Sequence, residues 1–416
     1  MWSSAQLKDW QSWPGIHRVG VDNGADCARG PMPETNAGLP RTARDLADDP
    51  LLAIAEAFVL PGPVVEISPL GSGNVNDTYR VRVRLQDGQA DQLVLQRINT
   101  RVFPQPELVM ANILRLGKHV QAHAGAVLSG RRWEVPRLLA VRDQPDRCWL
   151  ELDGEVWRTI TYVKGCRSCD VLEDRHQARE LGRGLGTFHA LISDLPVAEL
   201  ADTLEGFHIT PGYLVEFERA LRTTNVSLTP QAAHCIAFIR DRQRLAFVLE
   251  NAKAAGRLRL RPIHGDPKLN NVMFDRASGE AIALVDLDTI KPGLVHYDIG
   301  DCLRSGCNRL GEETADWRSV HFDLDLCEAI LEGYLNRAAA FLSEADYDHL
   351  FDAIRLIAFE LGLRFFTDHL AGNSYFKTDH PGHNLQRALV QFRLTESIET
   401  QEGAIRAMIE RLRVAS

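Results

Sequence analysis

The chain has 416 residues, of which 45% are hydrophobic and 25% are charged, the balance of a globular protein of about two or three domain-sized units. Its net charge of −9 and isoelectric point of about 5.9 argue against nucleic acid or an anionic membrane as the main partner, because both require clustered lysine and arginine. No apolar run reaches the roughly 18 residues that span a bilayer, and the first residues lack a signal-peptide pattern, so we expect a cytoplasmic protein.

Residues 1–43 differ in composition from the rest of the chain. They are rich in glycine, proline, asparagine and aspartate and show no apolar period, which predicts a loosely ordered extension. A helix is predicted to follow, with Leu51 and Ile54 on its apolar side, and Pro-Gly-Pro at 61–63 ends it.

The next hundred residues favour strands. The segment TYRVRVRL (78–85) alternates apolar and basic residues, and LVLQRI (93–98) follows an Asp-Gly turn as its partner strand. Residues 106–123 read as an amphipathic helix. Two more strands are predicted around Asp153-Gly154.

Beyond residue 161 the pattern becomes helical. This change predicts an α+β protein with two lobes, a β-rich N-lobe over 44–161 and a mostly helical C-lobe over 162–416, hinged near Thr161–Lys164. The clearest helical segments are 174–195, 323–342, 347–370 and 384–414.

The cysteines give no clear sign of a metal site. Eight are scattered along the chain, and Cys166 and Cys169 form a single C-x-x-C pair. A zinc site usually needs a second such pair or nearby histidines, so we expect reduced and mostly buried thiols.

The segment HGDPKLNN (264–271) concentrates polar side chains before a predicted β-hairpin. Asn271 comes just before the first strand, VMFD, and Asp286 follows the return strand. Because the open ends of an antiparallel hairpin meet, both side chains should reach one divalent cation. Amide and carboxylate oxygens suit Mg²⁺, with phosphate oxygens completing its shell.

Asp266 precedes Asn271 by five residues, the offset between the catalytic aspartate and the metal-binding asparagine of protein kinases. Gly265 and the later Asp-Leu-Asp depart from the protein kinase pattern. With YDIGD (297–301), they resemble the aminoglycoside phosphotransferase and choline kinase superfamily. The resemblance implies a bilobal protein kinase-like fold, ATP and Mg²⁺ as cofactors, Asp266 as the catalytic base, and Asn271 and Asp286 as metal ligands.

Nucleotide contacts are expected from the first β-rich lobe. In PLGSGNVNDTYRV (69–81), glycines between strands let backbone N–H groups approach phosphate oxygens, so Gly71, Gly73 and Asn74 are candidate nucleotide-binding residues. The strand LVLQRIN should carry the side chain that touches the α/β-phosphates. Arg97 is the candidate, but Gln96 is an alternative, and Arg97 could equally be an exposed strand arginine.

Several stretches together resemble the N-acetylhexosamine 1-kinases, which phosphorylate the anomeric hydroxyl of N-acetylglucosamine and N-acetylgalactosamine. They include VFPQPELVMANI, FELGLRFFTDHLAGNSYFK and GHNLQRALVQFRL, and with the motifs above they run from about residue 70 to 395. The resemblance places Arg364 and Tyr375 against the sugar beside Asp266. A surface ion pair for Arg364 and a packed helix-end aromatic for Tyr375 are the alternatives. The preferred epimer and the oligomeric state are not readable from the sequence.

Other polar residues near the motif have open roles. His264 should brace the loop through backbone contacts, and His189 should be a packing histidine. Lys268 either faces the transferring phosphate or is solvated, while Asp288 either holds a second cation or holds the loop. Rival functions are a kinase of the same fold acting on another sugar, an aminoglycoside, homoserine or choline, and an inactive nucleotide-binding module.

Overall fold

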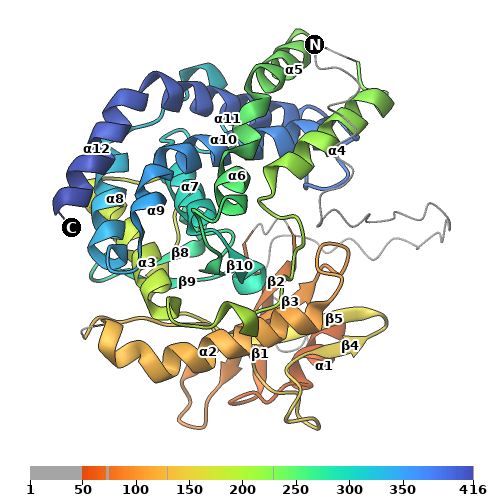
Figure 1. Cartoon of the computed structure of the whole chain (residues 1–416). Helices are drawn as coiled ribbons and strands as arrows, with labels where there is room; N and C mark the ends of the chain where they lie inside the picture. Colours follow the sequence, from red (N-terminus) through yellow and green to blue (C-terminus); the bar gives the residue numbers. More distant parts are fainter. Residues whose placement is uncertain (1–48, 72–74, 129, 228, 416) are drawn as a thin grey trace. The chain divides into compact units, whose positions relative to one another are not determined.

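The computed structural model describes residues 49–71, 75–128, 130–227 and 229–415, so the predicted extension over 1–43 lies outside the described residues. Five antiparallel strands form a sheet in the spatial order β1-β2-β3-β5-β4 (Figure 1). Their bounds are β1 Val64–Pro69, β2 Asp77–Arg84, β3 Ala90–Ile98, β4 Leu150–Leu152 and β5 Glu155–Thr161.

The strand predictions for this sheet are confirmed. Along β2, Val81 and Val83 are fully buried, while Arg80 and Arg82 point to the other face and pair with Glu66 of β1. Successive side chains of a strand lie on opposite faces, so the alternating sequence gives this strand one face in the hydrophobic core and one face with charged side chains. The turn between β4 and β5 uses Asp153-Gly154, both with positive φ.

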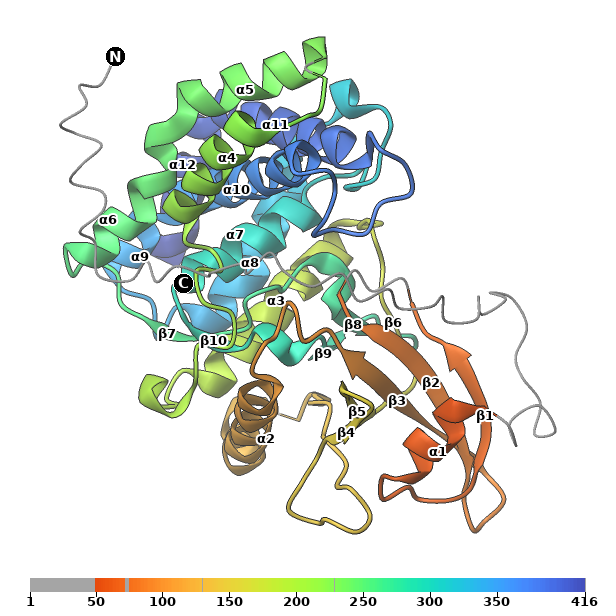
Figure 2. The same cartoon turned by 90° about the vertical axis from the view of Figure 1, so that its right-hand side faces the viewer.

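Two helices accompany the sheet. Helix α1 (Pro50–Glu56) begins at Asp49, whose side chain accepts a hydrogen bond from the Leu51 N–H at 3.0 Å, and its Ile54 and Ala55 join the core of the sheet. Helix α2 (Pro106–Leu128) runs beside the sheet (Figures 1 and 2) and extends the helix predicted over 106–123.

The remainder is mostly helical, as predicted. Helix α10 packs against α4, α7 and α11 (Figure 2). The helical segment predicted over 384–414 is two helices, because α11 ends at Thr400 and α12 begins at Glu402. The bounds are α3 Arg175–Ile192, α4 Thr210–Thr223, α5 Pro230–Arg242, α6 Val248–Ala254, α7 Val295–Gly306, α8 Leu324–Ala338, α9 Glu344–Asp348, α10 Leu350–Leu370, α11 His383–Thr400 and α12 Glu402–Ala415.

Helices α3 and α8 approach each other closely because glycines line their contact. A Cβ added at Gly182 would lie 1.8 Å from the Ile330 carbonyl oxygen, and one at Gly333 would lie 2.0 Å from that of Arg179. The two backbones therefore touch, which fixes α3 under the strands that carry the candidate site.

Short strands connect the helices to that site. Strands β8 (Val272–Asp275) and β9 (Ala281–Leu284) form the predicted hairpin, and β6 (Cys166–Arg167) pairs with β8. Strand β7 (Arg261–Ile263), which leads into HGDPKLNN, pairs with β10 (Lys291–Gly293).

One hydrophobic core joins early and late parts of the chain. It includes Met110 and Leu116 of α2, Val156 of β5, Phe188 of α3 and Phe359 of α10. None of the described helices is both long enough and apolar enough to cross a membrane.

Candidate active site

The loop between β7 and the 3-10 helix η4 (Leu269–Asn271) holds the histidine, glycine and aspartate of the motif. Gly265 has φ +91°, and a Cβ there would lie 2.5 Å from the Thr289 carbonyl oxygen, so both conformation and space require glycine. Asp298 of α7, which is fully buried, accepts hydrogen bonds from the N–H groups of His264 and Gly265 at 2.7 and 2.8 Å. The carboxylate of YDIGD therefore fixes the loop backbone.

His264 braces the same loop, as expected. Its Nε2 donates to the Val285 carbonyl oxygen at 3.0 Å, and its Nδ1 accepts from the Asp266 N–H at 3.3 Å. One nitrogen donates and the other accepts, so the ring is neutral, and burial lowers the pKa of His264. His189 is likewise a packed side chain, hydrogen-bonded to Asp298 at 2.9 Å.

Asp266 is surrounded by hydrogen-bond donors. Lys268 Nζ lies 2.7 Å from Asp266 Oδ2, and Asn271 Nδ2 donates to the Asp266 carbonyl oxygen at 2.8 Å and to Oδ2 at 3.1 Å. Burial alone would raise the pKa of Asp266, but attraction to Lys268 and their hydrogen bond lower it below its usual value. Asp266 therefore carries a negative charge at neutral pH and can accept a proton from a hydroxyl group.

Asp286 stands at the open end of the β8–β9 hairpin, next to Asn271. The Val285 N–H donates to the Asn271 carbonyl oxygen at 2.9 Å, which joins the two ends of the hairpin as the sequence predicted. Asp286 has φ +62°, an uncommon conformation that turns the chain after the strand. Asp286 is exposed as a residue.

These oxygens fit a divalent cation. Loss of surrounding water, followed by repulsion from Asp288 and Asp266, raises the pKa of Asp286 to about 6. Three carboxylates thus gather where Lys268 and Arg158 only partly offset their charge. The amide nitrogen of Asn271 is used by Asp266, which leaves the amide oxygen as the candidate hard ligand suited to Mg²⁺.

Asp288 holds the loop. It lies in the 3-10 helix η5 (Leu287–Thr289) and is 1% exposed. Its Oδ2 accepts from Asn76 Nδ2 at 2.7 Å, and its Oδ1 lies 2.5 Å from Arg158 Nη2. Both oxygens are engaged with residues of the N-terminal sheet region, so Asp288 braces the segment that carries Asp286.

Arg364 of α10 lies among aromatic rings. Its guanidinium carbon is 5.0 Å from the ring centre of Phe207, 5.1 Å from Tyr213, 5.5 Å from Phe376 and 6.0 Å from Tyr375. Within the described part of the chain it makes no ion pair, so the predicted alternative of a surface salt bridge does not hold. Burial would lower the pKa of Arg364, but Tyr213, Tyr375, Glu360 and Asp266 together raise it.

Tyr375 is 48% exposed, in the loop that follows α10. Asp368, on the last turn of α10, accepts from the N–H groups of Ser374 and Tyr375 at 2.9 Å and of Phe376 at 3.0 Å. Because one buried carboxylate holds three successive N–H groups, the loop carrying Tyr375 is fixed to the helix that carries Arg364.

A family model described as the phosphotransferase enzyme family (APH) matches residues 66–338, which include the strands, α2, the HGD loop and the hairpin. The chain belongs to this phosphotransferase family. As a member of that family it is a phosphotransferase.

Solved structures share the fold of this phosphotransferase. A microcompartment-associated aminopropanol kinase is similar with a TM-score of 0.55 and 16% identity, over 86% of this chain and 98% of that chain. An amicoumacin kinase in complex with AMP-PNP and Ca²⁺ is similar with a TM-score of 0.54 and 14% identity, over 86% of this chain and 95% of that chain. A choline kinase from Cryptosporidium parvum is similar with a TM-score of 0.51 and 13% identity, over 84% of this chain and 93% of that chain. These likenesses confirm the predicted α+β fold, with an N-terminal antiparallel sheet and a mostly helical C-terminal region.

The structure describes only some of the candidate nucleotide-binding residues of this phosphotransferase. Gly71 has φ +71°, while Gly73 and Asn74 lie outside the described residues. Arg97 donates from both Nε and Nη2 to one oxygen of Asp77, Oδ2, and its Nη1 lies 3.7 Å from Glu155 Oε1. Its neighbour Gln96 points to the opposite face of the sheet.

The face with Gln96 holds a residue that the sequence did not single out. Arg158 of β5 is 2% exposed and donates to Gln96 Oε1 at 3.0 and 2.8 Å while it pairs with Asp288. The alternation of β5 predicts which strand residues share a face, but it does not say that an arginine would lie on the buried one.

A second site residue that the sequence did not single out is His208. Its φ is +65°, and it is 5% exposed. Its Nε2 donates to the Gly265 carbonyl oxygen at 2.7 Å and its Nδ1 to Glu360 Oε1 at 2.8 Å. Since both nitrogens face acceptors, the ring is an imidazolium that ties the HGD loop to α10.

Proposed function

We propose that this phosphotransferase moves the γ-phosphoryl group of ATP to the anomeric hydroxyl of N-acetylglucosamine or N-acetylgalactosamine, giving the sugar 1-phosphate. The observation that carries the proposal is Arg364, a guanidinium without an ion pair among the described residues, held among aromatic rings and within electrostatic reach of Asp266. A planar donor beside an exposed Tyr375 suits the hydroxyl groups, acetamide oxygen and ring face of a sugar.

Asp266 is the proposed base. Its charged carboxylate orients the sugar hydroxyl and accepts its proton as the oxygen attacks the γ-phosphorus. Lys268 keeps this carboxylate ionised, and its cation is proposed to face the transferred phosphoryl group as well. Most of the rate enhancement then comes from positioning and electrostatics, because the loose transition state needs little covalent help.

Asn271 and Asp286 are the proposed metal ligands. A bound Mg²⁺ would neutralise charge on the β- and γ-phosphates. Gly71, Gly73, Asn74 and Arg97 are the proposed nucleotide contacts. For Arg97 this requires that its guanidinium leave or share Asp77, which sets it apart from the other three.

A cationic acceptor such as choline or an aminoglycoside fits the site less well. The aromatic rings that could bind an ammonium group already surround Arg364, and its positive charge repels a second cation. Another neutral sugar and homoserine remain the rival acceptors of the same fold. An inactive nucleotide-binding module is disfavoured because Asp266, Asn271 and Asp286 are all present.

The test is ATP consumption with a panel of free hexoses, N-acetylhexosamines, aminoglycosides, choline and homoserine. We expect turnover with N-acetylglucosamine or N-acetylgalactosamine and much weaker turnover with glucose and galactose, because a missing acetamide leaves site donors unpaired. Phosphorus NMR should show the product phosphate coupled to H1. Coupling to two H6 protons would contradict the anomeric assignment.

Arg364→Ala separates acceptor binding from nucleotide binding. It should raise KM for the sugar far more than KM for ATP, and Arg364→Lys should recover only part of the loss, because lysine lacks the planar fork. Arg355→Ala is the matched control, an arginine of the same helix over the ring of Phe351. Unchanged sugar kinetics in Arg364→Ala would move the enzyme to another acceptor.

A further inference from the structure

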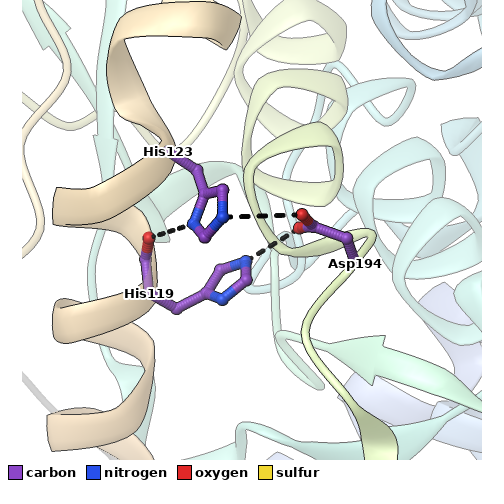
Figure 3. Close-up of side chains that lie close together, drawn as sticks. All are labelled: His119, His123 and Asp194. Carbon is purple, nitrogen blue, oxygen red and sulfur yellow. Dashed lines mark hydrogen bonds and ion pairs between the residues drawn. The ribbon is translucent and has the colours of Figure 1, made fainter.

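Two histidines and an aspartate meet away from the residues of the candidate active site. His119 and His123 are one turn apart on α2, and Asp194 follows α3 (Figure 3). His119 Nε2 lies 2.8 Å from Asp194 Oδ1, and His123 Nε2 lies 3.7 Å from Asp194 Oδ2. The three candidate ligand atoms all lie within 4.8 Å of one another.

The orientation of His123 is set by a contact that metal-binding histidines commonly make. Its Nδ1 lies 2.8 Å from the His119 carbonyl oxygen, an acceptor only, so Nδ1 carries the proton. In the neutral form that binds a metal, the ring has its lone pair on Nε2, the nitrogen that faces Asp194 (Figure 3). A hydrogen bond from the remote nitrogen to a backbone carbonyl fixes both tautomer and ring direction in metal sites.

We propose that His119, His123 and Asp194 bind a divalent transition-metal ion, Zn²⁺ being the expected one. Two neighbouring ligands of a tetrahedral zinc ion lie roughly 3.3–3.4 Å apart. The spacings from the two histidines to Asp194, 2.8 and 3.7 Å, differ from this by about half an ångström or less, and the third spacing is at most 4.8 Å, so side-chain rotations would have to bring the two histidine nitrogens closer together. Imidazole nitrogens with one carboxylate suit zinc, nickel or copper, whereas Mg²⁺ prefers oxygen ligands alone. Water would complete the shell, because His123 and Asp194 are exposed.

The ion would join two parts of the fold. Helix α2 packs against α3 and against η5, the segment that contains Asp288. On α2, Asn112 is 1% exposed and donates to the carbonyl oxygens of Ala201 and Ile290 at 2.9 and 2.8 Å. A metal bound by α2 and the end of α3 would hold this helix in place and stabilise the native state, which brings the three ligands together.

The test is calorimetric titration of the full-length protein, free of any affinity tag, with ZnCl2 in a buffer that contains excess Mg²⁺. We expect one zinc ion per chain and a higher melting temperature in its presence. His123→Ala and Asp194→Asn change exposed side chains, so they should fold normally, weaken zinc binding by about ten-fold or more and abolish the thermal shift.

Two control variants exclude other sites. His321→Ala removes an exposed histidine outside the cluster, and Asp286→Ala removes a proposed magnesium ligand. Both should bind zinc as the wild type does. Wild-type protein that binds no zinc, or equal binding by His123→Ala and wild type, would overturn the proposal. Loss of binding in Asp286→Ala alone would assign the zinc to the active site instead.

Discussion

Asp266 has its charge and position set by neighbours on the same short loop. If it is the base, Asp266→Asn should lower kcat by about 10²–10⁴ while ATP still binds, because the amide keeps the shape but cannot accept the proton. The measurements are turnover and the dissociation constant of ATP. Asn270→Ala changes an exposed residue of the same loop and should be nearly neutral. Near-normal turnover in Asp266→Asn would show that the aspartate has another role.

The pair of His208 and Glu360 predicts a pH dependence. Burial alone would lower the pKa of His208, but attraction to Glu360 and hydrogen bonds to Glu360 and Gly265 raise it above 6.5. The histidine therefore stabilises the fold fully below about pH 6.5, and this contribution is lost as the pH rises through its folded-state pKa.

His208→Gln should remove that pH dependence. In the wild type the free energy of unfolding should fall as the pH rises above about 6.5, and in the variant this fall should be absent. Breaking a buried ion pair should also cost about 3–5 kcal/mol. Chemical denaturation across this pH range measures both effects. His321→Gln, at an exposed position, should follow the wild-type profile, and a variant of His208 that did the same would refute the imidazolium assignment.

At the scale of elements, helix α10 carries several of the residues that we propose to bind or position the sugar. Glu360, Arg364 and Asp368 are spaced by four residues, so they form one polar stripe along a mostly apolar helix. The first bonds His208, the second lies among the aromatic rings, and the third holds the loop with Tyr375. One helix therefore aligns the HGD loop, the proposed sugar ligand and its aromatic neighbour.

Asp368→Ala should loosen that loop. Three backbone N–H groups and Asn384 Nδ2 would lose their acceptor, and hydrogen bonds to a charged group are worth about 1.5–3 kcal/mol each. We expect a higher KM for the sugar and an unchanged KM for ATP, together with lower thermal stability. Asp379→Asn, in the same loop but 93% exposed, is the matched control. Equal effects on both KM values would contradict a role confined to the acceptor.

The sequence predicted those elements whose signals are local. The hairpin between Asn271 and Asp286, the alternation of β2 and the Asp153-Gly154 turn each depend on neighbouring residues, and the structure confirms them. Arg158 and His208 could not be predicted, because their partners Asp288 and Glu360 lie far along the chain. Periodicity also cannot tell which face of a strand meets the site, so the choice between Gln96 and Arg97 stayed open.

At the scale of the whole molecule, residues 1–43 differ in composition from the rest of the chain. Deletion of residues 1–43 should leave a folded, active enzyme, because this segment lacks an apolar periodic face that could be buried. Circular dichroism and sugar-dependent ATP consumption measure the outcome. Deletion of residues 1–57 should destabilise the protein, since it removes Ile54 and Ala55 from the core of the sheet. An insoluble or inactive 1–43 deletion would make the segment part of the fold or of a dimer contact.

The contact between Arg158 and Asp288 bears on how the protein unfolds. The predicted boundary at residues 161–162 separates the arginine from the aspartate, and each is almost completely buried. A fragment that ends at this boundary would contain Arg158 without Asp288, and the remaining fragment would contain Asp288 without Arg158. In each fragment a charge that is buried in the whole protein would lack its partner, which destabilises the folded state. The boundary thus separates a strand-rich from a helix-rich part of the sequence, but not two units that fold independently. Heat or denaturant should therefore unfold residues 49–415 in a single cooperative transition.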